Sequence, residues 1–292
     1  MSSPARHIVC RMTSASTSTA AATSIGARPV AADRVRQVAV LVSAVLALVG
    51  AFVGSGAAGG TPIAKAAGGA LSADATMLSP AGPAFAIWTV IYLGLVGYAI
   101  WQAFPSQAAK PRQRGIGYWM LASLLLNAFW ILSVQFGMLA VSAVLIAALL
   151  VVLIVAFVLL QRIHGGSTAD AILFDGTTGL YLGWVMVATV ANVTSLLVAA
   201  GFDGFGWSPH AWGIALVVVA TVLGAALAIW DRGRLTPAVA SAWGLAWIGV
   251  SRLTGTLVSA PVAITAIAAA VVLLMIALAV RVGGRGRTPA RS

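Results

Sequence analysis

Apolar stretches long enough to cross a bilayer recur along this chain and limit what it can fold into. A transmembrane helix needs about 20 mainly apolar residues to cross the hydrocarbon core. Eight such stretches occur, at about residues 36–57, 83–104, 116–135, 138–160, 176–199, 211–230, 236–251 and 260–281. The sequence therefore predicts an all-α integral membrane protein, a polytopic bundle of about eight transmembrane helices. The seventh stretch must end before Arg252 or carry it into the headgroup region, so seven spans is the alternative.

The composition excludes several classes of site. Apolar residues make up 61% of the chain and charged residues 8%, against roughly 25% charged residues in soluble proteins. The single cysteine, Cys10, excludes an intramolecular disulfide and a cysteine-rich metal centre. The three histidines are scattered, and neither a Ser–His–Asp arrangement nor a phosphate-binding loop appears. We therefore expect no metal, no cofactor and no enzymatic activity.

The basic residues predict the orientation of the spans. In the eight-span arrangement, 15 of the 17 Lys and Arg fall on one side, and only Lys65 and Arg252 fall on the other. Lys and Arg concentrate on the cytoplasmic side of membrane proteins. We therefore expect a multi-pass protein of the cell membrane with both termini in the cytoplasm. The net charge of +11 thus reflects topology, and we expect no nucleic-acid partner.

Aromatic and polar side chains form a stripe along one face of three predicted helices. The stripes consist of Phe85, Trp88, Tyr92 and Leu95; of Ser123, Asn127, Trp130 and Val134; and of Tyr181, Trp184, Ala188, Asn192 and Ser195. Polar side chains within a bilayer are costly and face the bundle interior. We expect the stripes to converge on one cavity with aromatic walls. The alternative is that the two Asn link helices and the aromatic rings fill the interior.

The remaining tryptophans and one arginine lie nearer the ends of the predicted spans. Five tryptophans fit the aromatic belts found at membrane interfaces: Trp101, Trp119, Trp207, Trp212 and Trp230. Trp243 and Trp247 are four residues apart and fit either an anchor or a pocket. We expect Arg252 to extend toward lipid headgroups, with recognition of a ligand carboxylate as the alternative.

Three segments resemble the TspO/MBR family of translocator and tryptophan-rich sensory proteins, in the family's order. They are PAGPAFAIWTVIY with Pro80, Pro83, Phe85, Trp88 and Tyr92, LLLNAFWIL with Asn127 and Trp130, and GLYLGWVMVATVANV with Tyr181, Trp184, Ala188 and Asn192. The resemblance is closest to the longer bacterial members. The chain departs from the family in the separation of Pro80 from Pro83 and in three spans that follow the five-helix unit.

The resemblance implies a five-helix bundle whose ligand cavity is closed by the loop between the first two helices. It also implies binding of tetrapyrroles or sterol-like molecules, and we do not expect sterols here because no cholesterol-recognition pattern follows Asn192. The closing loop would be residues 58–82. The ligand-binding residues carried over are Pro83, Phe85, Trp88, Tyr92, Asn127, Trp130, Tyr181, Trp184 and Asn192.

We expect four regions along the chain. These are a disordered cytoplasmic tail over residues 1–35, the TspO-like bundle over 36–200, three additional helices over 201–281 and a basic cytoplasmic tail over 282–292. Residues 34–60 also resemble a signal peptide, but the seven later stretches and the charge count favour a retained helix. Small residues in the last three spans suit close packing, either within the bundle or in a homodimer: Gly224, Ala225, Ala226, Gly244 and Gly249.

The leading hypothesis is a membrane protein that binds a hydrophobic aromatic ligand, such as a tetrapyrrole, as a sensor or facilitator. A small-molecule transporter or permease is the alternative, and the lack of a carboxylate in the middle of any span argues against proton coupling. A membrane enzyme acting on lipid or isoprenoid substrates would need a buried acid, base or metal cluster, and the sequence shows none.

Overall fold

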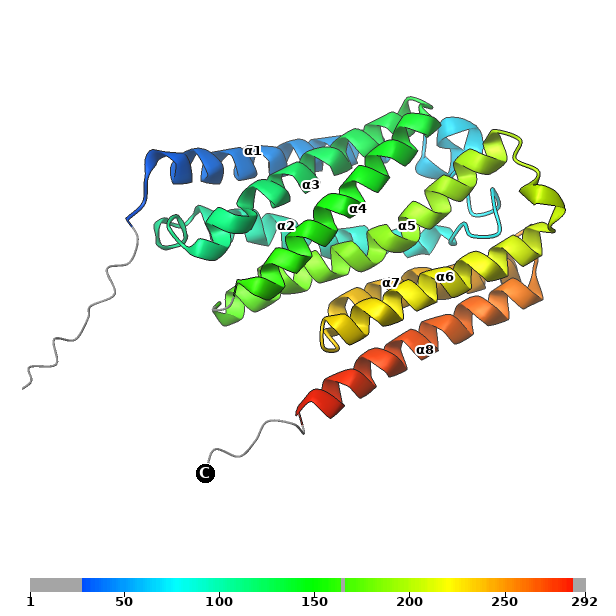
Figure 1. The fold of residues 1–292 in the computed structure, drawn as a ribbon. Coiled ribbons are helices and arrows are strands. Elements are labelled where there is room, and N and C mark those ends of the chain that lie inside the picture. The colour runs from blue at the N-terminus through cyan, green and yellow to red at the C-terminus, as the bar shows by residue number, and fades with distance from the viewer. Residues whose placement is uncertain (1–27, 164–165, 286–292) are drawn as a thin grey trace, which may run out of the picture.

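In the part of the chain that the structure describes, eight long helices lie side by side in one bundle (Figure 1). The computed structural model describes residues 28–163 and 166–285, and this part of the chain contains no strand. The long helices are α1 (Ala31–Gly54), α2 (Ile87–Ala103), α3 (Pro111–Gln135), α4 (Leu139–Arg162), α5 (Thr177–Ala199), α6 (Pro209–Trp230), α7 (Leu235–Thr254) and α8 (Ala260–Arg285). The short helices are η1 (Ile63–Gly69), η2 (Gly82–Ala86), η3 (Pro105–Gln107), η4 (Asp170–Gly176) and η5 (Gly204–Gly206). The predicted all-α polytopic bundle is confirmed.

Seven of the eight long helices, counted with the short helices that lead into them, are long and apolar enough to cross a membrane. The eighth, α7, is not apolar enough. α7 packs between α5 and α8, and its buried residues include Ser241, Ser251 and Arg252. A helix that is covered by other helices does not need an apolar surface toward lipid. The weakest of the eight predicted spans is therefore a helix of membrane-crossing length whose polar residues face protein.

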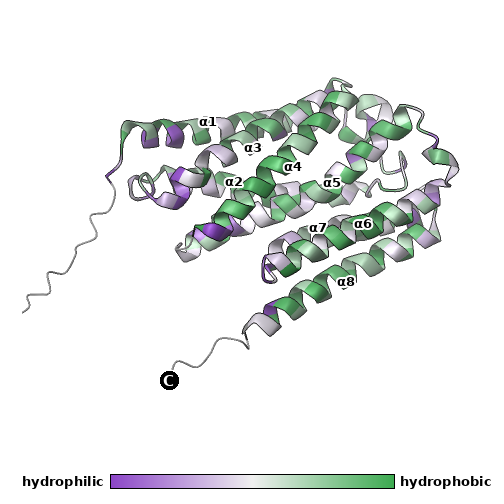
Figure 2. Cartoon of the chain, in the orientation of Figure 1, coloured by the Kyte–Doolittle hydropathy of each residue, from purple (hydrophilic) through white to green (hydrophobic). Residues whose placement is uncertain are grey.

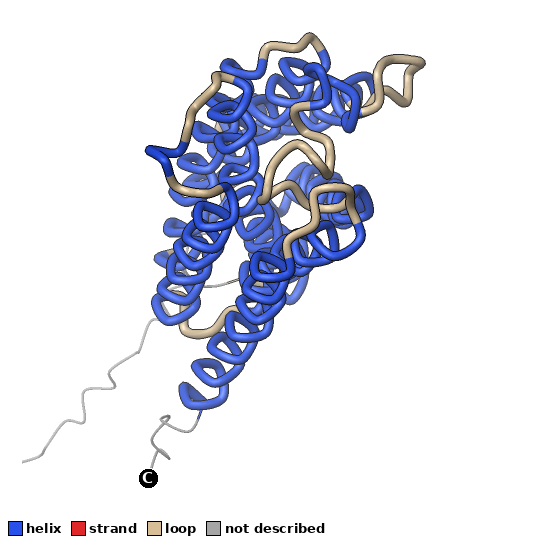
Figure 3. The backbone as a smooth tube through the Cα atoms, turned by 90° about the vertical axis from the view of Figure 1, so that its right-hand side faces the viewer, coloured by secondary structure: helices blue, strands red, loops and turns tan. Residues whose placement is uncertain are grey.

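The first five helices and the last three meet along α5 and α7. α1 packs on α3, α3 on α4 and α4 on α5, while α7 packs on α5 and α8. α6, α7 and α8 lie together on one side of α5 (Figure 1). The longest non-helical segments gather at the end of the bundle away from the C-terminus (Figure 3), and we call this the loop end.

Glycines allow the backbones of α5 and α7 to approach closely. A Cβ at Gly183 would overlap the carbonyl oxygen of Pro237, and a Cβ at Gly244 would lie 2.9 Å from Val187. The Ser241 hydroxyl donates to the carbonyl oxygen of Gly183 at 3.0 Å. Such close approach, reinforced by hydrogen bonds, is how helices associate in membranes. Gly244, one of the small residues predicted for close packing, therefore serves a contact within the chain.

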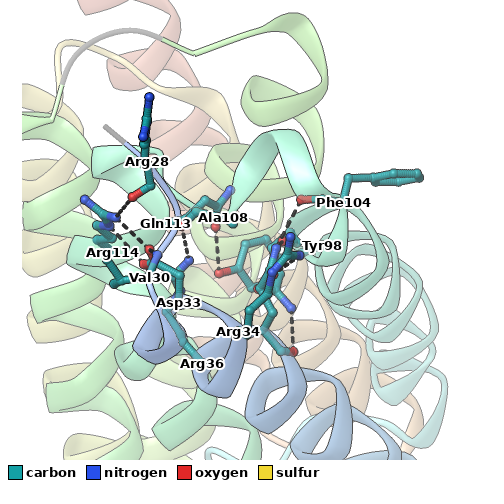
Figure 4. A network of polar contacts seen from close by, with 12 residues as sticks. Arg28, Val30, Asp33, Arg34, Arg36, Tyr98, Phe104, Ala108, Gln113 and Arg114 are labelled. Atoms are coloured by element: carbon teal, nitrogen blue, oxygen red, sulfur yellow. Dashed lines mark hydrogen bonds and ion pairs between the residues drawn. The ribbon is translucent and has the colours of Figure 1, made fainter. Parts of the chain in front are cut away.

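The opposite end of the bundle carries strongly hydrophilic residues, as the colouring of Figure 2 shows. Here the buried Asp33 carboxylate accepts hydrogen bonds from Arg36 at 2.8 Å and from Arg114 at 2.6 Å (Figure 4). Arg36 also donates to the carbonyl oxygen of Ala108 at 2.7 Å, and Arg112 pairs with Asp175. We call this the basic end. α1 begins and α8 ends on this side of the bundle (Figure 1).

These ion pairs explain why α1 and α3 begin earlier than predicted. α1 begins at Ala31 rather than residue 36, and α3 begins at Pro111 rather than residue 116. Paired charges can be buried between helices, so a helix continues beyond its apolar stretch. The predicted tail over 1–35 therefore contributes its last residues to α1, and α8 extends to Arg285. Residues 1–27 and 286–292 of the two predicted tails lie outside the described residues.

Candidate functional site

Aromatic rings from α2, α3 and α5 meet inside the bundle around Trp88. The ring centroid of Trp88 lies 5.6 Å from Tyr92, 6.0 Å from Trp130, 5.7 Å from Tyr181 and 6.3 Å from Trp184. Phe85 of η2 completes the group through an edge contact with Trp184 at 5.8 Å. We call these six residues the aromatic cluster. The structure thus brings together the aromatic members of the three stripes, at separations typical of favourable ring pairs.

The two intramembrane Asn link neighbouring helices beside the aromatic cluster. Asn127 of α3 donates to the hydroxyl of Tyr92 in α2 at 2.6 Å. Asn192 of α5 and Ser142 of α4 face each other at 3.3 Å. The hydroxyl of Tyr181 donates to the carbonyl oxygen of Ser123 at 3.3 Å. These bonds fix the relative positions of α2, α3, α4 and α5, as the helix-linking alternative predicted for the two Asn.

A small cavity lies between the aromatic cluster and the loop over residues 58–82. Its volume is about 30 Å³, and its walls come from η2, α3, α5 and the loop. The lining residues include Trp130, Trp184, Asn192 and Ser195 on the helices and Leu71, Ser79 and Pro80 in the loop. This space suffices for a water molecule but not for an aromatic ligand. The cavity therefore has no room for an aromatic ligand in this structure.

Several buried polar atoms around this cavity have no hydrogen-bond partner in the described structure. They are Nε1 of Trp130, Nε1 of Trp184 and Oγ of Ser195, and Oδ1 of Asn127 beside the aromatic cluster is a fourth such atom. Buried polar groups are normally paired, because leaving one unpaired costs about 1–3 kcal/mol. Two indole N–H donors on residues that line one cavity are suited to hold an acceptor atom of a ligand or a bound water.

Of the nine predicted site residues, four line the cavity: Phe85, Trp130, Trp184 and Asn192. Trp88, Tyr92, Asn127 and Tyr181 lie beside it through the aromatic cluster and its hydrogen bonds. Pro83 is exposed at the beginning of η2 and does not line the cavity, whereas Pro80 does. Leu71 and Ser79 line the cavity but were missed by the sequence analysis. The only signal for these two residues was their position in the long loop predicted to close the site.

α7 holds this loop in place at the loop end of the bundle. Arg252 and Ser251 both donate to the carbonyl oxygen of Ala73. The carboxylate of Asp74 accepts from the backbone N–H groups of Thr256 at 2.9 Å and Leu257 at 3.3 Å, just beyond α7. Hydrogen bonds from Leu257 and Thr256 lower the pKa of Asp74. We call these contacts the loop clamp.

The prediction that Arg252 extends to lipid headgroups is wrong. The side chain is fully buried, because the loop covers the end of α7 and supplies the Ala73 carbonyl as its partner.

The two tryptophans of α7, Trp243 and Trp247, position the segment that enters α2. Nε1 of Trp243 donates to the carbonyl oxygen of Ala84 at 2.8 Å, and the carbonyl oxygen of Trp247 accepts from the N–H of Ala81 at 3.1 Å.

The tryptophans predicted as interfacial anchors divide into two groups. Trp119, Trp207 and Trp230 are exposed, as an anchor requires. Trp101 and Trp212 also donate their indole N–H groups within the chain, to Asp170 at 3.0 Å and to the carbonyl oxygen of Gly204 at 2.9 Å.

The comparison with family models decides the family. The model described as TSPO-like protein matches residues 39–279. The chain belongs to the TSPO-like protein family. The match begins in α1 and ends in α8, so it includes the last three helices as well as the first five. The chain is thus a multi-pass membrane protein of the TSPO-like family, and no curated protein and no solved structure matches it.

Proposed function

We propose that this TSPO-like protein binds a hydrophobic, flat aromatic ligand at the aromatic cluster, and that it acts as a sensor or facilitator for that ligand rather than as an enzyme. A tetrapyrrole is an example of such a ligand and serves as the probe in the test below. The observation that carries the proposal is the pair of buried, unpartnered indole N–H groups of Trp130 and Trp184 beside one cavity.

In this proposal four aromatic residues of the site have distinct physical roles. Trp88 lies at the centre of the aromatic cluster, so its ring and that of Tyr181 supply stacking surface. The indole N–H groups of Trp130 and Trp184 donate to an acceptor such as a carboxylate of the ligand. Because the cavity holds only about 30 Å³, binding requires the loop over 58–82 and some rings to move. The loop clamp then controls access.

The location of the protein follows the same reasoning. We propose that it resides in the cell membrane with both termini in the cytoplasm. The support is the concentration of arginines at the basic end, where α1 begins and α8 ends. The loop and the closed cavity then lie toward the outer face, from which the ligand would enter.

Quenching of tryptophan fluorescence tests the ligand-binding proposal. The full chain in detergent is titrated with protoporphyrin IX, alongside the variants Trp184→Phe and Asn192→Ala. Trp119→Phe is the matched control, because Trp119 is 37% exposed and belongs to none of the stripes. We expect saturable quenching that weakens in the two site variants and not in the control. Quenching that is linear, or equal in all four proteins, would refute the proposal.

A proton-coupled transporter would use a proton gradient to accumulate the ligand, whereas a facilitator needs none. Each of the six Asp lies in a loop or near a helix end: Asp33, Asp74, Asp170, Asp175, Asp203 and Asp231. This placement leaves no carboxylate in the middle of the bundle, where proton-coupled transporters carry one. Ligand uptake into proteoliposomes should therefore proceed without a proton gradient, and gradient-dependent accumulation would favour a transporter.

A further inference from the structure

A second and larger cavity lies at the loop end, between α5 and α6. Its volume is about 630 Å³, within the range of about 300–1,000 Å³ typical of small-molecule sites. Its α5 wall consists of Thr189, Val190, Val193, Thr194, Leu197 and Val198, whereas the α5 residues of the small cavity include Ala188, Asn192 and Ser195. The loop also contributes Thr76, Met77 and Leu78 to the larger cavity, whereas Ser79 and Pro80 line only the small one. The two cavities therefore use different faces of α5 and share no lining residue.

A group of aromatic rings from the segment between α5 and α6 and from the first turn of α6 lines this cavity. Ring centroids lie 6.1 Å apart for Phe202 and Trp212 and 5.7 Å apart for Trp207 and Trp212. All three residues line the cavity. A Cβ at Gly204 would lie 2.8 Å from Nε1 of Trp212, so glycine is needed there for the indole to approach the turn. We call Phe202, Trp207 and Trp212 the aromatic rim.

Among the described residues, Asp203 is the one charged residue that lines this cavity. Its Oδ1 accepts from the backbone N–H of Phe205 at 2.9 Å, and no ion pair among the described residues involves it. The hydroxyls of Thr189 and Thr194 donate to carbonyl oxygens of their own helix at 2.7 and 2.8 Å. The cavity thus combines an apolar body, aromatic faces and one negative charge, and its lining residues include no cation that would attract an anion.

We propose that this cavity is a binding site for a lipophilic organic cation. The apolar part of the ligand occupies the space between α5 and α6. Its positive centre lies at Asp203 and against the faces of the aromatic rim, where cation–π attraction adds to the charge pairing. An aromatic belt at the membrane interface accounts for exposed tryptophans. It does not account for a carboxylate beside a cavity of this size.

Two probes of nearly the same shape and opposite charge test this inference. Tetraphenylphosphonium is cationic and tetraphenylborate is anionic, so a cavity that selects only for apolar character binds both. Equilibrium dialysis of the full chain in detergent, with empty micelles as the baseline, measures each directly. We expect saturable binding of tetraphenylphosphonium at one site per chain, with tetraphenylborate bound at least about tenfold more weakly, the scale of one charge contact.

The variant Asp203→Asn removes the negative charge but keeps the hydrogen bond of the turn, because the amide oxygen can still accept from the N–H of Phe205. We expect it to weaken tetraphenylphosphonium binding by roughly tenfold, and Trp207→Leu by roughly threefold. Asp231→Asn removes the same charge at the basic end and should bind as the wild type does. Equal binding of both probes, no binding of either, or unchanged binding in Asp203→Asn would overturn the inference. Protoporphyrin quenching should stay unchanged in Asp203→Asn, so the two sites are tested separately.

Discussion

The substitution Arg252→Gln tests whether α7 holds the loop closed over the aromatic cluster. Arg252 is fully buried, and it donates to the carbonyl oxygen of Ala73. A hydrogen bond that involves a charged group contributes about 1.5–3 kcal/mol. The Ser251 hydroxyl keeps its bond to the same carbonyl oxygen and Asp74 keeps its two bonds, so the variant loses one of the four contacts of the loop clamp. We therefore expect the equilibrium between closed and open loop to shift by roughly 10- to 100-fold.

Amide hydrogen exchange measures this shift directly. The N–H of Ala81 is bonded to the carbonyl oxygen of Trp247, so it exchanges only when the segment leaves α7. In Arg252→Gln, peptides that cover residues 70–82 should exchange roughly 10- to 100-fold faster, while peptides of α3 should not change. Lys65→Gln is the matched control, because it removes an exposed charge from the same loop. Equal exchange in wild type and Arg252→Gln would refute the reasoning.

Two further predictions concern helix packing and pH. Gly183→Ala places a methyl group against the carbonyl oxygen of Pro237. We therefore expect a lower melting temperature in detergent and a loss of about 1–3 kcal/mol in the free energy of unfolding. The control Gly82→Ala, at a position that faces open space, should melt as the wild type does. Burial raises the pKa of Asp231 to about 6, above its ordinary value of 3.8. Its contribution to stability, up to about 3 kcal/mol, is fully present below pH 3.8 and is lost as the pH rises through about 6. The melting temperature should therefore fall between about pH 4 and about pH 6 and level off above that range. Asp231→Asn should reduce that fall, and an identical pH dependence in both proteins would contradict the assignment.

Helical periodicity was sufficient to predict which aromatic rings meet. A residue three or four positions along a helix returns to the same face, so Trp88, Trp130 and Trp184 could each be assigned to an inward stripe from sequence. The cost of polar groups in a bilayer supplied the direction of each stripe. Both rules apply to one helix at a time, so they predict the inward face of each helix without knowing which helices are neighbours.

Contacts between distant segments could not be predicted in the same way. Arg252 meets Ala73 across 179 positions of the chain, and nothing in the local sequence of α7 indicates that a loop will cover it. Asp33 and Arg114 pair inside the bundle and so extend α1 and α3. A hydropathy pattern cannot predict this contact, because it describes each segment separately. The unpartnered indole N–H groups likewise become visible only when the neighbours of each ring are known.

The most direct test of the proposed function observes those indole N–H groups themselves. The chain has ten tryptophans, and each contributes one indole signal to a ¹H–¹⁵N spectrum of the labelled protein. The variants Trp130→Phe and Trp184→Phe assign the two signals from the cavity. On addition of protoporphyrin IX, we predict that these two signals shift most, downfield as new hydrogen bonds form, while that of the exposed Trp119 stays in place. A spectrum in which exposed tryptophans respond and the signals of Trp130 and Trp184 do not would contradict ligand binding at the aromatic cluster.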